Sequence, residues 1–300
     1  MPSTIQDRIG TRFRRIITST PDGVPPWLGV VAEGNDAGMY LPTDEPWQVH
    51  ANFTTLVGGI RALLMQALHP GSLAGVEQHS RYETDALGRL AGTTRWLTIM
   101  TFGSRSAIAH EAARVNGMHS RVTGEFENAQ GVKQPYRASD PDLLLWVHIA
   151  FTDSFLTTYQ LYSGNTVDAD RYVALWSQAV EPLGLRDCPM TQAALHNALE
   201  KFDKDGILRV DDTTHRVVKF IRQPPLSRTA RFAYWFLFQG AVASMPAKYR
   251  HRLGLRSLPM WIVGPITRTL LQAMRLAVGS HSPIEEAAVA RLARIGALPL

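Results

Sequence analysis

Apolar residues recur along this chain with the three- and four-residue spacing of amphipathic helices. One stripe is especially regular, because Ile108, Ala112, Val115, His119 and Val122 follow one another in steps of four, three, four and three. His119 takes the place of an apolar residue, so we expect its ring to point into the core. A buried imidazole without a partner costs roughly 1–3 kcal/mol. A metal ion or a hydrogen-bond acceptor should therefore meet its free nitrogen.

The same periodicity predicts helices along the whole chain, and strand-like alternation is scarce. The predicted helices cover residues 4–18, 48–68, 87–102, 105–122, 141–162, 168–181, 191–203, 211–222, 227–244, 259–278 and 283–295. Asp140 and Pro141 suit the start of one of them, as cap and first-turn residue. The segments 21–46 and 123–138 are predicted loops.

This pattern predicts an all-α fold, a single helical domain. Its first half is expected to carry the chemistry. The chain has 300 residues, of which 45 % are hydrophobic, enough for a substantial core. We find no internal repeat.

Composition excludes several kinds of site. Cys188 is the only cysteine, so an intramolecular disulfide and a multi-cysteine zinc or iron–sulfur centre are ruled out. The sequence also lacks the glycine-rich nucleotide loops, the nucleophile elbow of serine hydrolases and the HExxH zinc motif. The net charge of +5 selects no partner by itself, and no nucleic-acid recognition motif is present.

The N-terminus predicts a cytoplasmic protein. It is basic but has no apolar stretch of signal-peptide length, and no run in the chain approaches the roughly 18 apolar residues of a transmembrane helix. A basic amphipathic helix could form there and rest on a membrane or a partner, although packing on its own domain is favoured. Its apolar positions are Ile5, Ile9, Phe13, Ile16 and Ile17.

Three further histidines in the first half of the chain are candidates for a role. His148 lies on a helix that is apolar on nearly all sides, so it should be buried, as a core histidine bonded to a backbone carbonyl or, less favoured, as a ligand. His69 precedes Pro70 and ends its helix, where a protonated ring would suit the helix dipole. His79 is expected to cap or tie a loop.

A second pattern combines polar and apolar groups. Arg89, Thr93, Trp96 and Met100 share one face of the predicted helix 87–102. They could form the half-polar wall of a pocket. Alternatively, Arg89 pairs with a nearby acid at the surface, and the pattern alone does not separate these readings.

The order of motifs resembles the MpaB/rubber-oxygenase (latex-clearing protein) catalytic domain family. The motifs are LVGGIRALLMQALHPGSLAGVEQHSRY, GRLAGTTRWLTIMTFG, RVNGMHSRVTG, YRASDPDLLLWVHIAFTDS and the later SMPAKYRHRLGL. The resemblance covers roughly residues 45–255, which it implies form the catalytic domain. Residues 1–44 are then an N-terminal helix and loop, and residues 256–300 are C-terminal helices packed on the same domain. The resemblance implies an all-helical, globin-like core and, as in the rubber oxygenases, a heme b whose iron is held by one histidine and used with dioxygen.

The resemblance also implies roles for individual residues. The axial iron ligand of the family falls on His119, the pocket arginine and threonine on Arg89 and Thr93, and a further histidine on His148. Three arginines could then reach the heme propionates, with ordinary surface charge as the alternative. They are Arg95, Arg114 and Arg121.

Two departures from the family pattern bear on the substrate. The lysine that can close the distal side of the iron is replaced by Gly92, and Glu77 is only the nearest candidate for the catalytic glutamate. The missing export signal argues against an insoluble polymer. We therefore expect an oxygenase of a small hydrophobic or isoprenoid-like molecule. A heme- or lipid-binding carrier or sensor without turnover, and a helical interaction module without a cofactor, are the alternatives.

Overall fold

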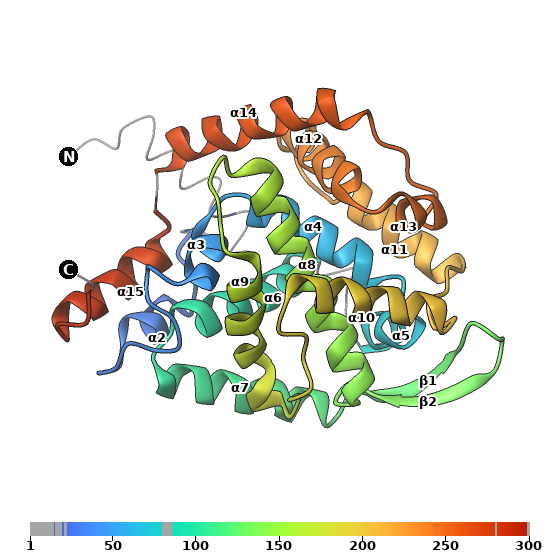
Figure 1. Ribbon diagram of the computed structural model, residues 1–300, viewed down its shortest axis with the longest axis horizontal. Helices are drawn as coiled ribbons and strands as arrows, with labels where there is room; N and C mark the ends of the chain where they lie inside the picture. Colours follow the sequence, from blue (N-terminus) through green and yellow to red (C-terminus); the bar gives the residue numbers. More distant parts are fainter. Residues whose placement is uncertain (1–14, 16–19, 21–22, 80–85, 280, 299–300) are drawn as a thin grey trace. The chain divides into compact units, whose positions relative to one another are not determined.

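A computed structural model describes Arg15, Thr20 and residues 23–79, 86–279 and 281–298, except for the side chains at positions 79, 86–91 and 229. The predicted amphipathic helix 4–18 lies outside these residues. The all-α fold class is confirmed (Figure 1). The elements are α2 (Leu28–Ala32), α3 (Glu45–Ala51), α4 (Thr55–Gln66), α5 (Pro70–His79), α6 (Ala86–Phe102), α7 (Arg105–His119), β1 (Thr123–Glu127), β2 (Lys133–Arg137), α8 (Pro141–Tyr162), α9 (Ala169–Ser177), the 3-10 helix η1 (Gln178–Leu183), α10 (Gln192–Lys204), α11 (Asp212–Arg222), α12 (Arg228–Ser244), α13 (Ala247–Arg252), α14 (Met260–Val278) and α15 (Pro283–Arg294).

The chain folds into two compact units, each assembled from separate stretches. The first unit comprises residues 1–53, 81–114 and 271–300, and the second comprises residues 54–80 and 115–270. The division into stretches ending at residues 44 and 255 stays a prediction. None of the helices in the described ranges is long and apolar enough to cross a membrane.

In the first unit, α2, α3, α6 and α15 enclose a small apolar core. Trp47 meets Phe102 edge to face, with the ring centroids 4.8 Å apart. The indole N–H of Trp27 donates to Thr98 Oγ1 over 2.8 Å, which ties the loop before α2 to α6. The core residues are Trp27, Val31, Trp47, Ile99, Phe102, Ala107, Ile284, Ala288 and Leu292.

In the second unit, α8 is the central helix, as its apolar surface on nearly all sides predicts. It packs against α4, α5, α9, α10 and α12 (Figure 1). The contact with α4 is close at Gly58, where an added Cβ would lie 2.7 Å from Phe155 and 2.8 Å from Thr158. A side chain at position 58 would therefore force the two helices apart, which explains the glycine in an otherwise apolar helix.

Two predicted elements differ from the structure. The single helix predicted over 48–68 is broken into α3 and α4, because Asn52 adopts an extended conformation (φ −81°, ψ 144°) at the end of α3. The loop predicted over 123–138 is an antiparallel β-hairpin of β1 and β2. Its turn is closed by Asn128, whose side chain accepts N–H groups of Gln130 and Val132, and by Gly131 at φ 78°.

The hairpin is held on one face by aromatic packing. Phe126 and Tyr136 pack with Ala74 and Leu143 in a second apolar cluster. The Tyr136 hydroxyl also donates to Gln78 Oε1 over 3.1 Å. A hairpin is typically indicated by asparagine and glycine in the turn, with alternating apolar residues on either side. Here each strand has only five residues, which is too short for the alternation to be recognised in the sequence.

His69 lies between α4 and α5, and its ring caps the start of α5 instead of the end of α4. The residue lies immediately before α5, and its Nδ1 accepts the backbone N–H groups of Gly71 (3.1 Å) and Ser72 (3.4 Å) in the first turn of that helix. Burial lowers the pKa of His69 to about 4, and the lone pair on Nδ1 is free to accept only in the neutral ring. The prediction of a protonated ring was therefore wrong.

Acid is expected to release this cap. The pKa of His69 is lower in the folded state than in the unfolded chain. The stabilisation from this cap is therefore complete above the ordinary histidine pKa of 6.5 and is lost as pH falls toward about 4. We expect His69→Asn, which can still cap, to reduce the loss of unfolding free energy below pH 6.5 by up to about 1.4 kcal/mol per pH unit. Urea titrations at pH 7 and pH 5 measure it, and an unchanged pH dependence would contradict this role.

Candidate functional site

The stripe on α7 is confirmed up to the last turn of the helix. Ile108, Ala112 and Val115 are buried. His119 is only partly buried, because α7 ends at this residue and the chain turns into the hairpin instead of continuing to residue 122. The structure thus corrects the expectation of a fully buried ring. The backbone carbonyl of His119 accepts the N–H of Val122 in this turn.

His148 is the more deeply buried of the two histidines assigned by resemblance. It lies in the middle of α8 with 5 % of its surface exposed. Burial lowers the pKa of His148 to about 4, so its ring is neutral near pH 7. Within the described part of the chain no group hydrogen-bonds to this ring, and the predicted bond to a backbone carbonyl is not formed. A neutral imidazole with an unused lone pair is suited to binding a metal ion.

Arg89 and Thr93 both lie on α6, which belongs to the first unit, whereas His119 and His148 belong to the second. Thr93 is partly buried, as is Trp96, and Met100 is completely buried at the end of the same helix. The side chain of Arg89 lies outside the described residues. The proposed half-polar wall thus stays a prediction.

The three arginines assigned to heme propionates have other surroundings. Arg95 and Arg114 are both ion-paired to Glu111, a carboxylate with no exposed surface, at 2.8 Å and 2.5 Å. Arg114 uses two nitrogens in this contact, and the hydrogen bond to Glu111 raises its pKa. These two residues neutralise a buried acid, and their assignment to heme propionates stays a prediction. Arg121 is exposed in the turn after α7 and not on that helix.

A buried ion pair that sequence analysis missed connects three helices of the second unit. Arg61 on α4 contacts Asp153 on α8 at 2.7 Å and donates to Ser154 Oγ, and all three side chains are buried. His196 on α10 lies 3.3 Å from the other oxygen of Asp153. The sequence did contain a signal for this pair, because Arg61 and Asp153 each lie in the interior of an apolar helix. Charges in such positions are rarely buried unless they are paired.

The electrostatics of this network are cooperative. Burial would raise the pKa of Asp153, but Arg61 and His196 outweigh it and lower the pKa. The hydrogen bond to Asp153 in turn raises the pKa of His196. Glu77, by contrast, is paired with Arg216 of α11 at 2.6 Å and lies on a helix, so it is not a loop acid.

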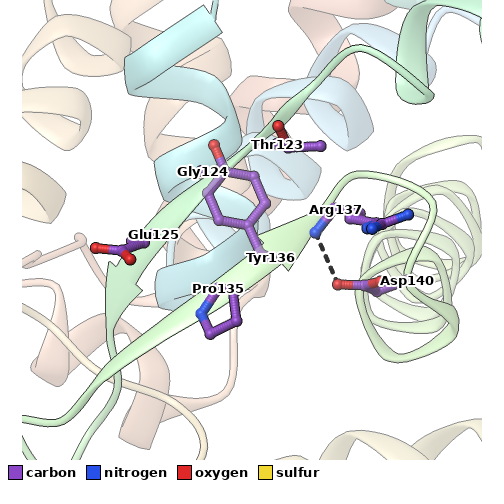
Figure 2. Close-up of a pocket in the computed structure, with 7 residues that line it drawn as sticks. All are labelled: Thr123, Gly124, Glu125, Pro135, Tyr136, Arg137 and Asp140. Carbon is purple, nitrogen blue, oxygen red and sulfur yellow. Dashed lines mark hydrogen bonds between the residues drawn. The ribbon is translucent and has the colours of Figure 1, made fainter.

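A shallow cavity of about 530 Å³ lies along the hairpin (Figure 2). It is lined by both strands and by Asp140, whose carboxylate accepts the N–H of Arg137 over 2.8 Å instead of capping α8. None of the predicted site residues lines this cavity. Among the described residues, no three His, Cys, Asp or Glu side chains gather as metal ligands.

Comparison with known proteins decides the family. A family model described as "ER-bound oxygenase mpaB/B'/Rubber oxygenase, catalytic domain" matches residues 47–294. The chain belongs to this family. No curated protein and no solved structure matches it, so the globin-like core stays a prediction.

Membership of the mpaB/rubber oxygenase family supports an oxygenase role for the chain, and with it an enzyme. The matched region contains every residue assigned by resemblance, and it extends beyond the predicted limit at residue 255 to the end of α15. At Gly92, the position that the resemblance assigns to the distal lysine, a Cβ would meet no heavy atom within 4 Å.

Two histidines of the second unit have the donor chemistry that a heme iron requires. Since a porphyrin supplies four nitrogens, the protein needs to add only one or two ligands. His148 is buried and neutral with no hydrogen bond to its ring among the described residues, and His119 stands at the end of α7 in the same unit. Arg121 is the one arginine of the three that forms no ion pair within the described part of the chain.

Proposed function

We propose that the chain is a heme b-dependent oxidoreductase, an oxygenase that acts with dioxygen on a small hydrophobic or isoprenoid-like substrate. The observation that carries this proposal is the family match over residues 47–294. The neutral, buried ring of His148 adds to it, since the imidazole can donate a lone pair without first losing a proton.

Each residue then has a definite task. When bound, the heme would supply the activation of dioxygen. His119 would hold the iron through one ring nitrogen, and the other ring nitrogen would donate its N–H to an acceptor, which sets the tautomer. Arg89 and Thr93 donate hydrogen bonds that orient dioxygen or the substrate. His148 is a second candidate ligand.

An absorption spectrum of the purified protein tests the proposal. We expect a Soret band that shifts on reduction with dithionite, and consumption of dioxygen when a hydrophobic alkene is added. Heme loading without oxygen consumption would favour a carrier or sensor. Protein that stays colourless when heme is supplied in excess would contradict heme binding altogether.

The hydroxyl of Thr93 offers a matched test of turnover. Thr93→Val keeps the shape of the side chain and removes one hydrogen-bond donor, so we expect oxygen consumption to fall about tenfold or more with heme content unchanged. Thr94→Val, at the neighbouring and equally half-buried position, is the control. Equal activity of the two variants would remove Thr93 from the site.

A further inference from the structure

One long segment of the chain contains no acidic residue. Residues 213–284 hold nine Arg and two Lys against no Asp or Glu, a net charge of +11. The chain as a whole has 31 basic and 26 acidic residues, so the rest carries 20 against 26, or −6. The positive charge of this protein is therefore concentrated in the part that forms most of α11 and all of α12, α13 and α14.

The first turns of α12 combine this charge with exposed aromatic rings. Arg228, Arg231, Phe232 and Trp235 are all exposed and recur at the spacing of one helix face. Phe232 leaves 69 % of its surface in contact with solvent. Large apolar side chains in such a position gain free energy only when another apolar phase covers them.

The first half of α14 has the same character. Trp261 is 77 % exposed, and Arg268 follows it on the solvent side. The two helices are packed together at Gly240, where an added Cβ would lie 2.9 Å from Thr267, and they run next to each other in Figure 1. We name the six exposed residues the α12–α14 surface: Arg228, Arg231, Phe232, Trp235, Trp261 and Arg268.

We propose that the protein binds peripherally to anionic lipid bilayers through the α12–α14 surface. Trp and Phe prefer the boundary between headgroups and acyl chains, and the arginines attract anionic headgroups. The segment itself adds no acidic residue that would repel a negative surface. Acidic residues of α5 and α10 pair with its Arg216, Lys248 and Arg252, and within the described ranges no ion pair engages an arginine of the α12–α14 surface. Aliphatic side chains nearby, Leu258 and Ile266, are exposed as well, and they gain from lipid but not from stacking on nucleic acid.

Vesicle sedimentation with the full chain tests the proposal. We expect binding to phosphatidylcholine vesicles that contain about 30 % phosphatidylserine, little binding to pure phosphatidylcholine, and release as the salt concentration approaches about 0.5 M. Failure to bind the anionic vesicles would overturn the proposal. Binding to DNA but not to vesicles would replace it with a nucleic-acid surface.

Paired variants locate the contact. Phe232→Ser with Trp261→Ser, and separately Arg228→Glu with Arg231→Glu, should each lower the vesicle partition coefficient at least tenfold. Val132→Ser with Met190→Ser removes two exposed apolar side chains elsewhere and should leave it within twofold.

A charge control completes the set. Arg186→Glu with Lys204→Glu reverses two exposed charges outside the surface and should also leave binding within twofold. The charge-reversed variant and the apolar variant test the electrostatic and the apolar contribution to binding separately. Thermal unfolding of each variant checks that it is folded. If both α12–α14 variants bind like the unaltered chain, another part of the protein contacts the membrane and the proposal is wrong.

Discussion

Replacing His119 by glycine is expected to abolish the Soret band of the heme-loaded protein. An axial histidine supplies the bond from protein to iron, so its removal leaves the cofactor without its anchor. Glycine leaves room for free imidazole, and adding imidazole should restore the band in His119→Gly. The exposed His251, replaced by alanine, is the control and should change nothing.

The corresponding change at His148 separates the two candidate ligands. If His119 is the axial ligand, His148→Gly should keep a Soret band of altered position or intensity. If only His148→Gly loses the band, the ligand is His148, and the residue correspondence taken from the family resemblance fails. Unchanged spectra in both variants would contradict histidine ligation by either residue.

Replacing Arg61 by methionine is expected to destabilise the second unit by about 3–5 kcal/mol. Methionine removes the positive charge and leaves Asp153, in a buried position, with the partly exposed His196 as its remaining charge partner. It also takes a hydrogen bond from Ser154. Urea unfolding followed by circular dichroism measures the change in the free energy of unfolding.

The double variant Arg61→Met with Asp153→Leu should regain most of the lost stability. Two apolar residues of similar volume avoid the desolvation of both charges. Replacing both members of the ion pair should therefore lower the free energy of unfolding much less than removing one of them. Lys201→Met breaks an exposed pair with Asp205 and should cost at most about 0.5 kcal/mol. A small effect of Arg61→Met would mean that water or a rearranged side chain reaches Asp153.

Contacts made within one helix were predictable, and several contacts between helices were not. The buried positions of α7 and the central place of α8 follow from the repetition of apolar residues every three or four positions. The sequence did not predict the break at Asn52 or the short hairpin. Each depends on a few residues, and over so short a stretch periodicity carries little information.

The candidate site divides in the same way. Burial of His148 could be read from the helix around it, because its neighbours at helical spacing are apolar. The half-exposed position of His119 could not, since it depends on where α7 ends. The pairing of Arg95 with Glu111 was also hidden, because these residues lie on different helices and meet only through tertiary packing.

The sequence by itself determined the all-α class, the membership of the mpaB/rubber oxygenase family and the histidines that could hold a heme. These properties reside in local spacing and in ordered motifs, which need no knowledge of distant neighbours. The tertiary structure alone decided which charges are neutralised, Asp153 by Arg61 and Glu111 by two arginines, and that His69 caps a helix as a neutral ring. Electrostatic partners depend on which surfaces come within a few ångströms and lose water, and only the packing of the helices sets that.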